Sequence, residues 1–161
     1  MFLGQYRHNL DNKGRLTVPA RYREMLEGGA YITQGFDRNL MIWQSSAFEA
    51  ISLRVGKMSI TDPASRLLRR LIFSSGERVE VDRSGRVLIP QFLRQAADLD
   101  GEAVVVGVGD YFEVWSPSLW DEQTAFLQDA EANAQRFMAF DLTSGRSTLT
   151  ALNQCNSAHN P

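Results

Sequence analysis

The chain has 161 residues, a mass of 18.1 kDa and a formal net charge of −2, and 43% of its residues are hydrophobic. This composition is typical of one compact globular domain or of two small fused units. No apolar stretch reaches the roughly 18 residues of a membrane-spanning helix. The first residues lack the apolar core of a signal peptide, and the single cysteine, Cys155, excludes an intrachain disulfide. We therefore expect a cytoplasmic protein that does not bind membranes.

Charge is distributed unevenly along the chain. Residues 7–23 hold five basic side chains against one acid, Asp11, whereas residues 98–131 hold nine acids and no lysine or arginine. A basic face and an acidic flank can therefore coexist in a chain of small net charge. The net charge alone does not exclude nucleic acid as a partner.

One segment occurs twice, 71 residues apart. Asp11-Asn12-Lys13-Gly14-Arg15-Leu16-Thr17-Val18-Pro19, followed by Arg23, returns as Asp82-Arg83-Ser84-Gly85-Arg86-Val87-Leu88-Ile89-Pro90, followed by Arg94. A repeat of this length indicates two copies of one structural unit. Packing does not require an identical aspartate and arginine beside a turn, so the repeat indicates binding or chemistry.

Each copy predicts the same series of elements. A strand leads to a glycine turn, a second strand ends at a proline, a short helix follows, and a hairpin and a longer helix complete the series. The expected strands are 6–10, 16–18, 30–33 and 40–43 in the first copy and 78–81, 87–89, 103–106 and 111–115 in the second. Gly14 and Gly85 are expected to take positive φ.

Two helix starts carry local signals. Ser46 and Glu49 predict a capping box after the first hairpin. Asp62-Pro63 predicts a further helix, because an aspartate N-cap followed by a proline is typical of a helix start. The apolar side of that helix is expected to carry Leu67, Leu68, Leu71 and Ile72.

The predicted fold class is α+β with a mainly β core. We expect a first repeat at residues 1–60, a linking helix at 61–72, a second repeat at 73–140 and a polar, disordered tail at 141–161. A half of about 70 residues built from strands with open edges is marginal alone. The two copies are therefore expected to interlock into one small barrel, with both Gly-Arg turns on one side.

Catalysis by the repeated turn is the first alternative. Asp11 and Asp82 could form an acid–base pair of a hydrolase, but no other catalytic group accompanies them, and His8 and His159 are not repeated. A cap on its own turn is the more common role of such an aspartate. We expect no enzyme activity, no cofactor and no metal site.

Nucleic-acid binding is the second alternative. Arg15 and Arg86 directly follow the turn glycines, and a guanidinium group can fork onto guanine O6 and N7 or onto phosphate. The simpler interpretation is an arginine that only pairs with its own aspartate. The predicted DNA-binding residues are Arg15, Arg86, Lys13, Arg83, Arg7 and Arg78, and the predicted turn-forming residues are Asp11, Gly14, Asp82 and Gly85. Since Ser84 replaces Lys13 in the second copy, we expect Arg15 to be the principal reader.

These motifs, together with the opening Met1-Phe2-x-Gly4, resemble the MraZ family of bacterial regulators, within the AbrB/SpoVT superfamily of swapped-hairpin DNA-binding domains. The resemblance extends from Met1 to about Phe140. It implies a tandem-repeat, swapped-hairpin AbrB-like β-barrel with flanking helices. It further implies that the subunits assemble into a ring, octameric or dodecameric. Both copies match the family's DNA-contacting motif Asp-x-x-x-Arg.

The resemblance also implies a function. Members of the family bind short G-rich direct repeats of double-stranded DNA in the promoter ahead of their own operon, usually as repressors of the division and cell-wall gene cluster. A cytoplasmic, nucleoid-associated location follows. The alternative is a ring-forming scaffold whose repeated turn binds an acidic protein partner, as the segregated charge suggests. Competition by promoter DNA discriminates the two.

Overall fold

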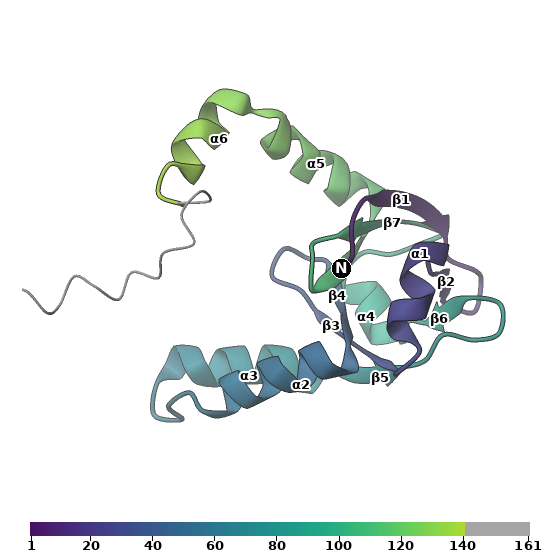
Figure 1. Cartoon of the computed structure of the whole chain (residues 1–161), viewed down its shortest axis with the longest axis horizontal. Helices are drawn as coiled ribbons and strands as arrows, with labels where there is room; N and C mark the ends of the chain where they lie inside the picture. Colours follow the sequence, from purple (N-terminus) through teal and green to yellow (C-terminus); the bar gives the residue numbers. More distant parts are fainter. Residues whose placement is uncertain (141–161) are drawn as a thin grey trace, which may run out of the picture. The chain divides into compact units, whose positions relative to one another are not determined.

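The computed structural model describes residues 1–140, so the expected tail lies outside the described residues. Met1–Thr124 form one compact unit, and the described residues from Ala125 to Phe140 belong to a second. The strands are β1 (Gln5–Asn9), β2 (Arg15–Thr17), β3 (Ala30–Gln34), β4 (Leu40–Gln44), β5 (Glu77–Val79), β6 (Arg86–Leu88), β7 (Glu102–Gly107) and β8 (Tyr111–Trp115). The helices are α1 (Ala20–Arg23), the 3₁₀ turn η1 (Glu24–Leu26), α2 (Ser45–Gly56), α3 (Pro63–Ser75), α4 (Gln91–Ala96), α5 (Pro117–Gln128) and α6 (Ala130–Phe137). Figure 1 shows these helices and strands coloured along the chain.

The strands form two antiparallel sheets. Six of them form a sheet in the order β1-β7-β8-β4-β3-β5, and the remaining two, β2 and β6, form a two-stranded ribbon. The order of the large sheet is symmetric about its centre, where β8 pairs with β4. Corresponding strands of the two repeats therefore occupy equivalent positions.

The two repeats interlock through their first strands. Strand β1 of the first repeat pairs with β7 of the second, with Tyr6 opposite Val105. Strand β5 of the second repeat pairs with β3 of the first, with Arg78 opposite Tyr31. The ribbon joins the repeats a third time, with Leu16 opposite Val87. Each repeat thus depends on the other for its strand partners.

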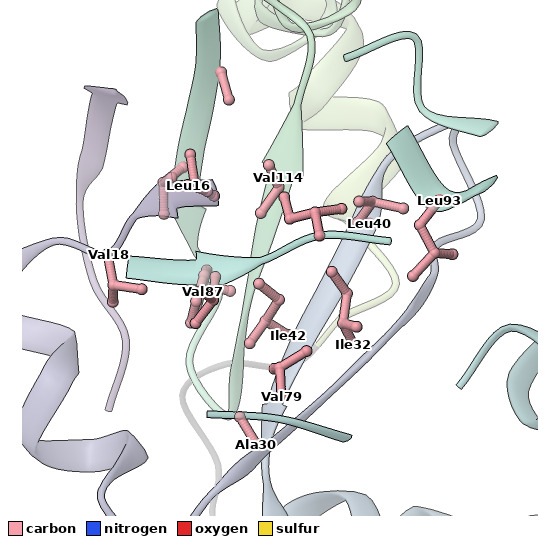
Figure 2. Packing of buried hydrophobic residues seen from close by; sticks show 14 of the residues in the cluster. Leu16, Val18, Ala30, Ile32, Leu40, Ile42, Val79, Val87, Leu93 and Val114 are labelled. Carbon is pink, nitrogen blue, oxygen red and sulfur yellow. The ribbon is translucent and has the colours of Figure 1, made fainter. Parts of the chain in front are cut away.

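Strand pairing does not close the sheet into a barrel. Strands β1 and β5 are the two edges of the large sheet, and among residues 1–140 they do not pair with each other. The barrel expected from the sequence is thus an open six-stranded sheet and a separate ribbon. Both pack on one core, and side chains from both are seen together in Figure 2.

Alternation along the strands assigns each residue to one of two layers. Leu40 and Ile42 point into the core shared with the ribbon. Their neighbours Met41 and Trp43 point to the opposite face, where Phe48 and Ile72 of α2 and α3 cover the sheet. Both faces of β4 are therefore buried, which explains a strand of continuous apolar residues.

The second hairpin is covered in a similar way. Val104 and Trp115 lie on the face of β7 and β8 that points away from the main core, and Trp120 at the start of α5 packs against them.

In the second unit, α6 is joined to the end of α5. The amide of Asn133 donates to the Leu127 carbonyl at 2.9 Å, and Arg136 lies over the Phe126 ring.

Most predicted elements are confirmed, with three exceptions. The Asp62 carboxylate accepts hydrogen bonds from the backbone of Ala64 and Ser65, as a helix cap should. The capping box is wrong: the N-cap of α2 is Gln44, two residues before Ser46, no side chain caps the helix there, and the Ser45 hydroxyl donates to the Gly28 carbonyl. Leu67 is 67% exposed, so it does not belong to the buried side of α3. Helix α6 was not predicted.

No helix among the described residues is both long and apolar enough to cross a bilayer.

The Leu16–Val87 pair provides a test of the interlocked core. Both side chains are fully buried, so Leu16→Ala should lower the free energy of unfolding by ~2–5 kcal/mol. Leu88→Ala is the matched control, because Leu88 lies on the same ribbon but is 56% exposed, and it should cost under ~0.5 kcal/mol. Urea unfolding measures both. Similar losses for the two variants would contradict the assignment of the ribbon's inner face.

Candidate nucleic-acid interface

The two repeated turns have the same backbone hydrogen bonds. In the first, the Asp11 N–H donates to the Arg15 carbonyl and the Gly14 N–H to the Asp11 carbonyl, both at 3.0 Å. In the second, the equivalent bonds at Asp82 and Gly85 measure 2.8 and 2.9 Å. Gly14 and Gly85 have φ values of +80° and +75°. The predicted turns and their positive-φ glycines are confirmed.

Each aspartate caps its own turn. Asp11 Oδ1 accepts the backbone N–H groups of Lys13 and Arg15 at 2.9 Å, and Oδ2 accepts Arg15 Nε at 2.6 Å. Asp82 repeats the arrangement, with Oδ1 accepting two backbone N–H groups at 2.8 and 3.0 Å and Oδ2 accepting Arg86 Nε at 3.1 Å. The carboxylates therefore shape the turns and orient the arginines.

These hydrogen bonds stabilise the charged form of both carboxyl groups. The backbone N–H of Arg15, reinforced by its side chain, lowers the pKa of Asp11 from 3.8 to about 2. The equivalent bonds from Arg86 also lower the pKa of Asp82. An acid–base pair would need one carboxyl with a raised pKa. The hydrolase hypothesis therefore has no support at this site.

The ribbon presents both arginines on its outer face. Side chains alternate along a strand, and Leu16 and Val87 point inward, so Arg15 and Arg86 point outward. Arg86 Nη1 also reaches Asp11 Oδ2 at 3.4 Å, and this contact joins the two turns into one cluster. About a third of each arginine side chain is exposed, with values of 32% and 28%.

The other predicted DNA-binding residues fall into two groups. Lys13 and Arg83 are exposed at the tips of the two turns, beside the ribbon. Arg7 lies on edge strand β1, 3.6 Å from Glu102 and 3.4 Å from Asp121. Those two carboxylates compete with phosphate for Arg7.

Arg78 lies on the opposite edge strand, β5, 3.8 Å from Glu80. It lines a hollow of about 560 Å³ beside the second turn, together with Arg83 and Arg23. The structure thus brings Arg78 close to the second turn, and Glu27, Glu80 and Asp82 line the same hollow.

Two further residues of the outer face were not identified from the sequence. Thr17 and Leu88 lie beside the arginines, and in the ribbon Thr17 is opposite Arg86 and Leu88 is opposite Arg15. The sequence did contain the information needed to identify them. Each residue stands two positions after its arginine in a β-prone run, and residues two apart on a strand point to the same face. Among residues 1–140, no group of His, Cys, Asp and Glu side chains could hold a metal ion.

Comparison with known proteins agrees with this geometry. A sequence model of the family described as "MraZ protein, putative antitoxin-like" matches residues 1–71 and again residues 72–141. A protein of Thermomicrobium roseum named transcriptional regulator MraZ is 44% identical over 79% of this chain and 89% of its own length. Proteins of the same name are 43% identical in Roseiflexus castenholzii, over 85% of this chain and 94% of their own length, and 39% in Moorella thermoacetica, over 88% and 100%.

The fold and the candidate site place this chain in a class of mainly β proteins with flanking helices. In this class, two repeats interlock, and one ribbon carries an Asp-x-x-x-Arg turn from each repeat. The family match covers nearly all of the described residues, in two copies. The chain belongs to the MraZ family.

Asp11→Asn tests the electrostatic role of the cap. A carboxyl whose pKa is lowered by folding stabilises the protein above its ordinary pKa, and this stabilisation disappears as the pH falls through the lowered value. The variant should therefore be less stable than the wild type at pH 7, and the gap should close between about pH 4 and pH 2. Urea unfolding across this range measures it. Asp110→Asn, at an exposed turn, is the control, and an equal pH-dependent gap there would contradict the assignment.

Proposed function

We propose that this protein is a sequence-specific DNA-binding transcriptional regulator that acts as a repressor. The observation that carries the proposal is the ribbon, which presents Arg15 and Arg86 on one outer face. Its relatives named transcriptional regulators support it independently. The major groove of B-DNA is wide enough to admit a two-stranded ribbon, and arginine is the most common reader of guanine there.

The proposal assigns the two arginines unequal roles. Asp11 takes the Nε–H of Arg15, and the Nη groups then remain for the bidentate contact with guanine O6 and N7. Arg86 is more heavily engaged, because Nε and Nη2 contact Asp82 and Nη1 contacts Asp11. Arg15 is therefore the principal reader, and Arg86 is the weaker and partly structural partner.

Lys13 and Arg83 supply phosphate contacts in this proposal. Both are exposed at the tips of the turns that flank the ribbon. A charged tip on each side holds the ribbon in register on the duplex, as phosphate contacts do in general. Arg78 lies beside Arg83 in the hollow at the second turn and supplies a further phosphate contact in this proposal, although Glu80 is 3.8 Å away and competes for it. Arg7 contributes least, since Glu102 and Asp121 neutralise it.

The proposal includes assembly of the subunits into a ring. Large apolar side chains of the α2–α3 hairpin are exposed in the single chain: Leu53 at 67%, Ile60 at 66% and Leu67 at 67%. Exposed apolar surface of this kind favours a contact with a neighbouring subunit. A closed ring presents many copies of the ribbon at fixed spacing, and avidity then offsets modest affinity at each site. Light scattering gives the subunit number.

The target in this proposal is the promoter of the protein's own operon, at the head of the division and cell-wall gene cluster. Short G-rich direct repeats suit a reader whose main contact is an arginine on guanine. The protein would then be cytoplasmic and nucleoid-associated. If promoter DNA does not compete with a protein ligand bound at the turns, the scaffold hypothesis is favoured instead.

A footprint of the wild type on the DNA upstream of its own gene tests the function. The footprint should cover G-rich direct repeats. Arg15→Ala should lose ~1–3 kcal/mol for each site contacted, amplified by avidity, and Arg86→Ala should lose less. Arg38→Gln, which removes the same charge from the exposed turn between β3 and β4, is the control and should leave the footprint intact. A wild type without a footprint there would refute the proposal.

Lys13→Ala tests the phosphate contact. Loss of one phosphate contact should weaken binding to all sequences equally and reduce the slope of log affinity against log salt by about 0.9 for each contact. Binding titrations at several salt concentrations measure the slope. Arg38→Gln is the control, since Arg38 is an exposed cation in the turn between β3 and β4, which belongs to neither the ribbon nor the α2–α3 hairpin. A change in base preference, rather than in salt dependence, would show that Lys13 reads sequence.

A further inference from the structure

Each repeated turn is covered by an arginine from the other repeat. A Cβ atom added to Gly14 would lie 2.5 Å from Cζ and 2.7 Å from Nε of Arg94. A Cβ atom added to Gly85 would lie 2.5 Å from Nε and 2.7 Å from Nη1 of Arg23. In both turns a guanidinium group therefore lies directly against the glycine, which explains why the two glycines are buried at the tip of an exposed loop.

The glycine peptides are held by the other repeat through their carbonyl groups as well. The Ile89 N–H donates to the Gly14 carbonyl at 2.9 Å, and the Val18 N–H donates to the Gly85 carbonyl at 2.9 Å. Arg94 follows Ile89 on the short helix α4, and Arg23 follows Val18 on α1. Each turn therefore makes two contacts with the opposite repeat. One is the hydrogen bond from a backbone N–H just after the ribbon strand, and the other is the arginine on the short helix that follows.

This arrangement reverses the pairing that the sequence suggests. In the sequence, Arg23 completes the motif that contains Gly14 and Arg15, and Arg94 completes the motif that contains Gly85 and Arg86. In space, Arg94 covers the turn that carries Arg15, and Arg23 covers the turn that carries Arg86. The planar guanidinium explains why an arginine occupies both positions, because it can stack on a flat peptide surface where no Cβ intervenes.

We infer that Arg94 is a positioning residue for Arg15, and that Arg23 is a positioning residue for Arg86. Arg94 holds the Gly14 peptide against β6, and through it fixes the direction in which Arg15 leaves the turn. Arg23 acts in the same way on Gly85 and Arg86. Neither residue reads a base in this scheme. The inference rests on the proposed DNA-binding function, because it concerns how the reading arginines are held.

Arg23 and Arg94 are not held in the same way. Arg23 Nε donates to the Val18 carbonyl at 3.0 Å, so its guanidinium is tied to the end of β2 as well as stacked on Gly85. Arg94 Nε is buried and has no hydrogen-bond partner among the described residues. Arg94 therefore lacks the hydrogen bond that ties Arg23 Nε to its own repeat.

Amide hydrogen exchange on the free protein tests the crossed pairing without DNA. Arg94→Ala should speed exchange at the Gly14 N–H severalfold and leave the Gly85 N–H unchanged, and Arg23→Ala should do the reverse. Each variant serves as the matched control for the other. If Arg94→Ala unfolds the chain, Arg94→Gln keeps a planar but shorter group and should give the same pattern more weakly. Acceleration in the variant's own repeat would overturn the inference.

Double-mutant cycles on promoter DNA test the positioning role. Arg94→Ala should weaken binding by roughly 3- to 30-fold in the wild type, but by little when Arg15 is already alanine, because residues that act together are not additive. The same change should remain fully effective when Arg86 is alanine. A loss of equal size in both backgrounds, with a smaller salt slope, would show that Arg94 contacts phosphate directly and would overturn positioning.

Arg94→Lys separates stacking from charge. Lysine keeps the charge but lacks the planar group, so it should restore neither the Gly14 exchange rate nor the affinity. Full restoration by lysine would overturn the stacking argument. If the two alanine variants give the crossed exchange pattern but the wild type binds no promoter DNA, the proposed function is refuted while the packing of Arg94 and Arg23 on the opposite turns is supported, so the two failures are distinguishable.

Discussion

The pairing of β2 with β6 is the contact on which the rest of the structure depends. Each of these strands has three residues, and neither belongs to the six-stranded sheet. Their inner residues Leu16 and Val87 are fully buried in the main core, so the ribbon is anchored by apolar packing and by its hydrogen bonds. Because inner and outer side chains alternate, the same packing fixes Arg15 and Arg86 on the outside. Core and candidate interface are two faces of one ribbon.

The two repeats share one fold, but their arginines differ in the number of carboxylate contacts they make. Both aspartates cap their turns in the same way, yet only Asp11 contacts arginines of both repeats. Because Arg86 Nη1 contacts Asp11 while Nε and Nη2 contact Asp82, all three guanidinium nitrogens of Arg86 contact carboxylates. Arg15 contacts a carboxylate through Nε alone. The tips also differ, because the basic residue is Lys13 in the first turn and Arg83, one position earlier, in the second. The positive charge of the two tips is therefore equal, and the shared carboxylate is the difference that makes Arg15 the more available arginine for an anionic partner.

Features set by local interactions were predictable from the sequence, and features set by distant contacts were not. The turns at Gly14 and Gly85 and the start of α3 at Asp62 depend on bonds between near neighbours. The start of α2 was misjudged because Ser45 bonds to Gly28, 17 residues away. Which strand pairs with which, and which arginine covers which glycine, depends on long-range packing that a repeat pattern cannot reveal. The outer ribbon face was the exception, since strand alternation alone would have added Thr17 and Leu88.

The asymmetry also bears on the kind of DNA site that the ribbon would suit. Two equivalent turns related by a twofold axis would match a palindromic site, because protein and operator symmetry correspond. Direct repeats have no such axis, so a reader of direct repeats needs one orientation on each site. The shared Asp11 and the different positions of Lys13 and Arg83 in their turns give the ribbon that direction while the repeated fold is retained. In a ring, each chain would then present its first turn in the same sense to successive repeats. Divergence between the two copies is therefore as necessary for the proposed function as the duplication itself.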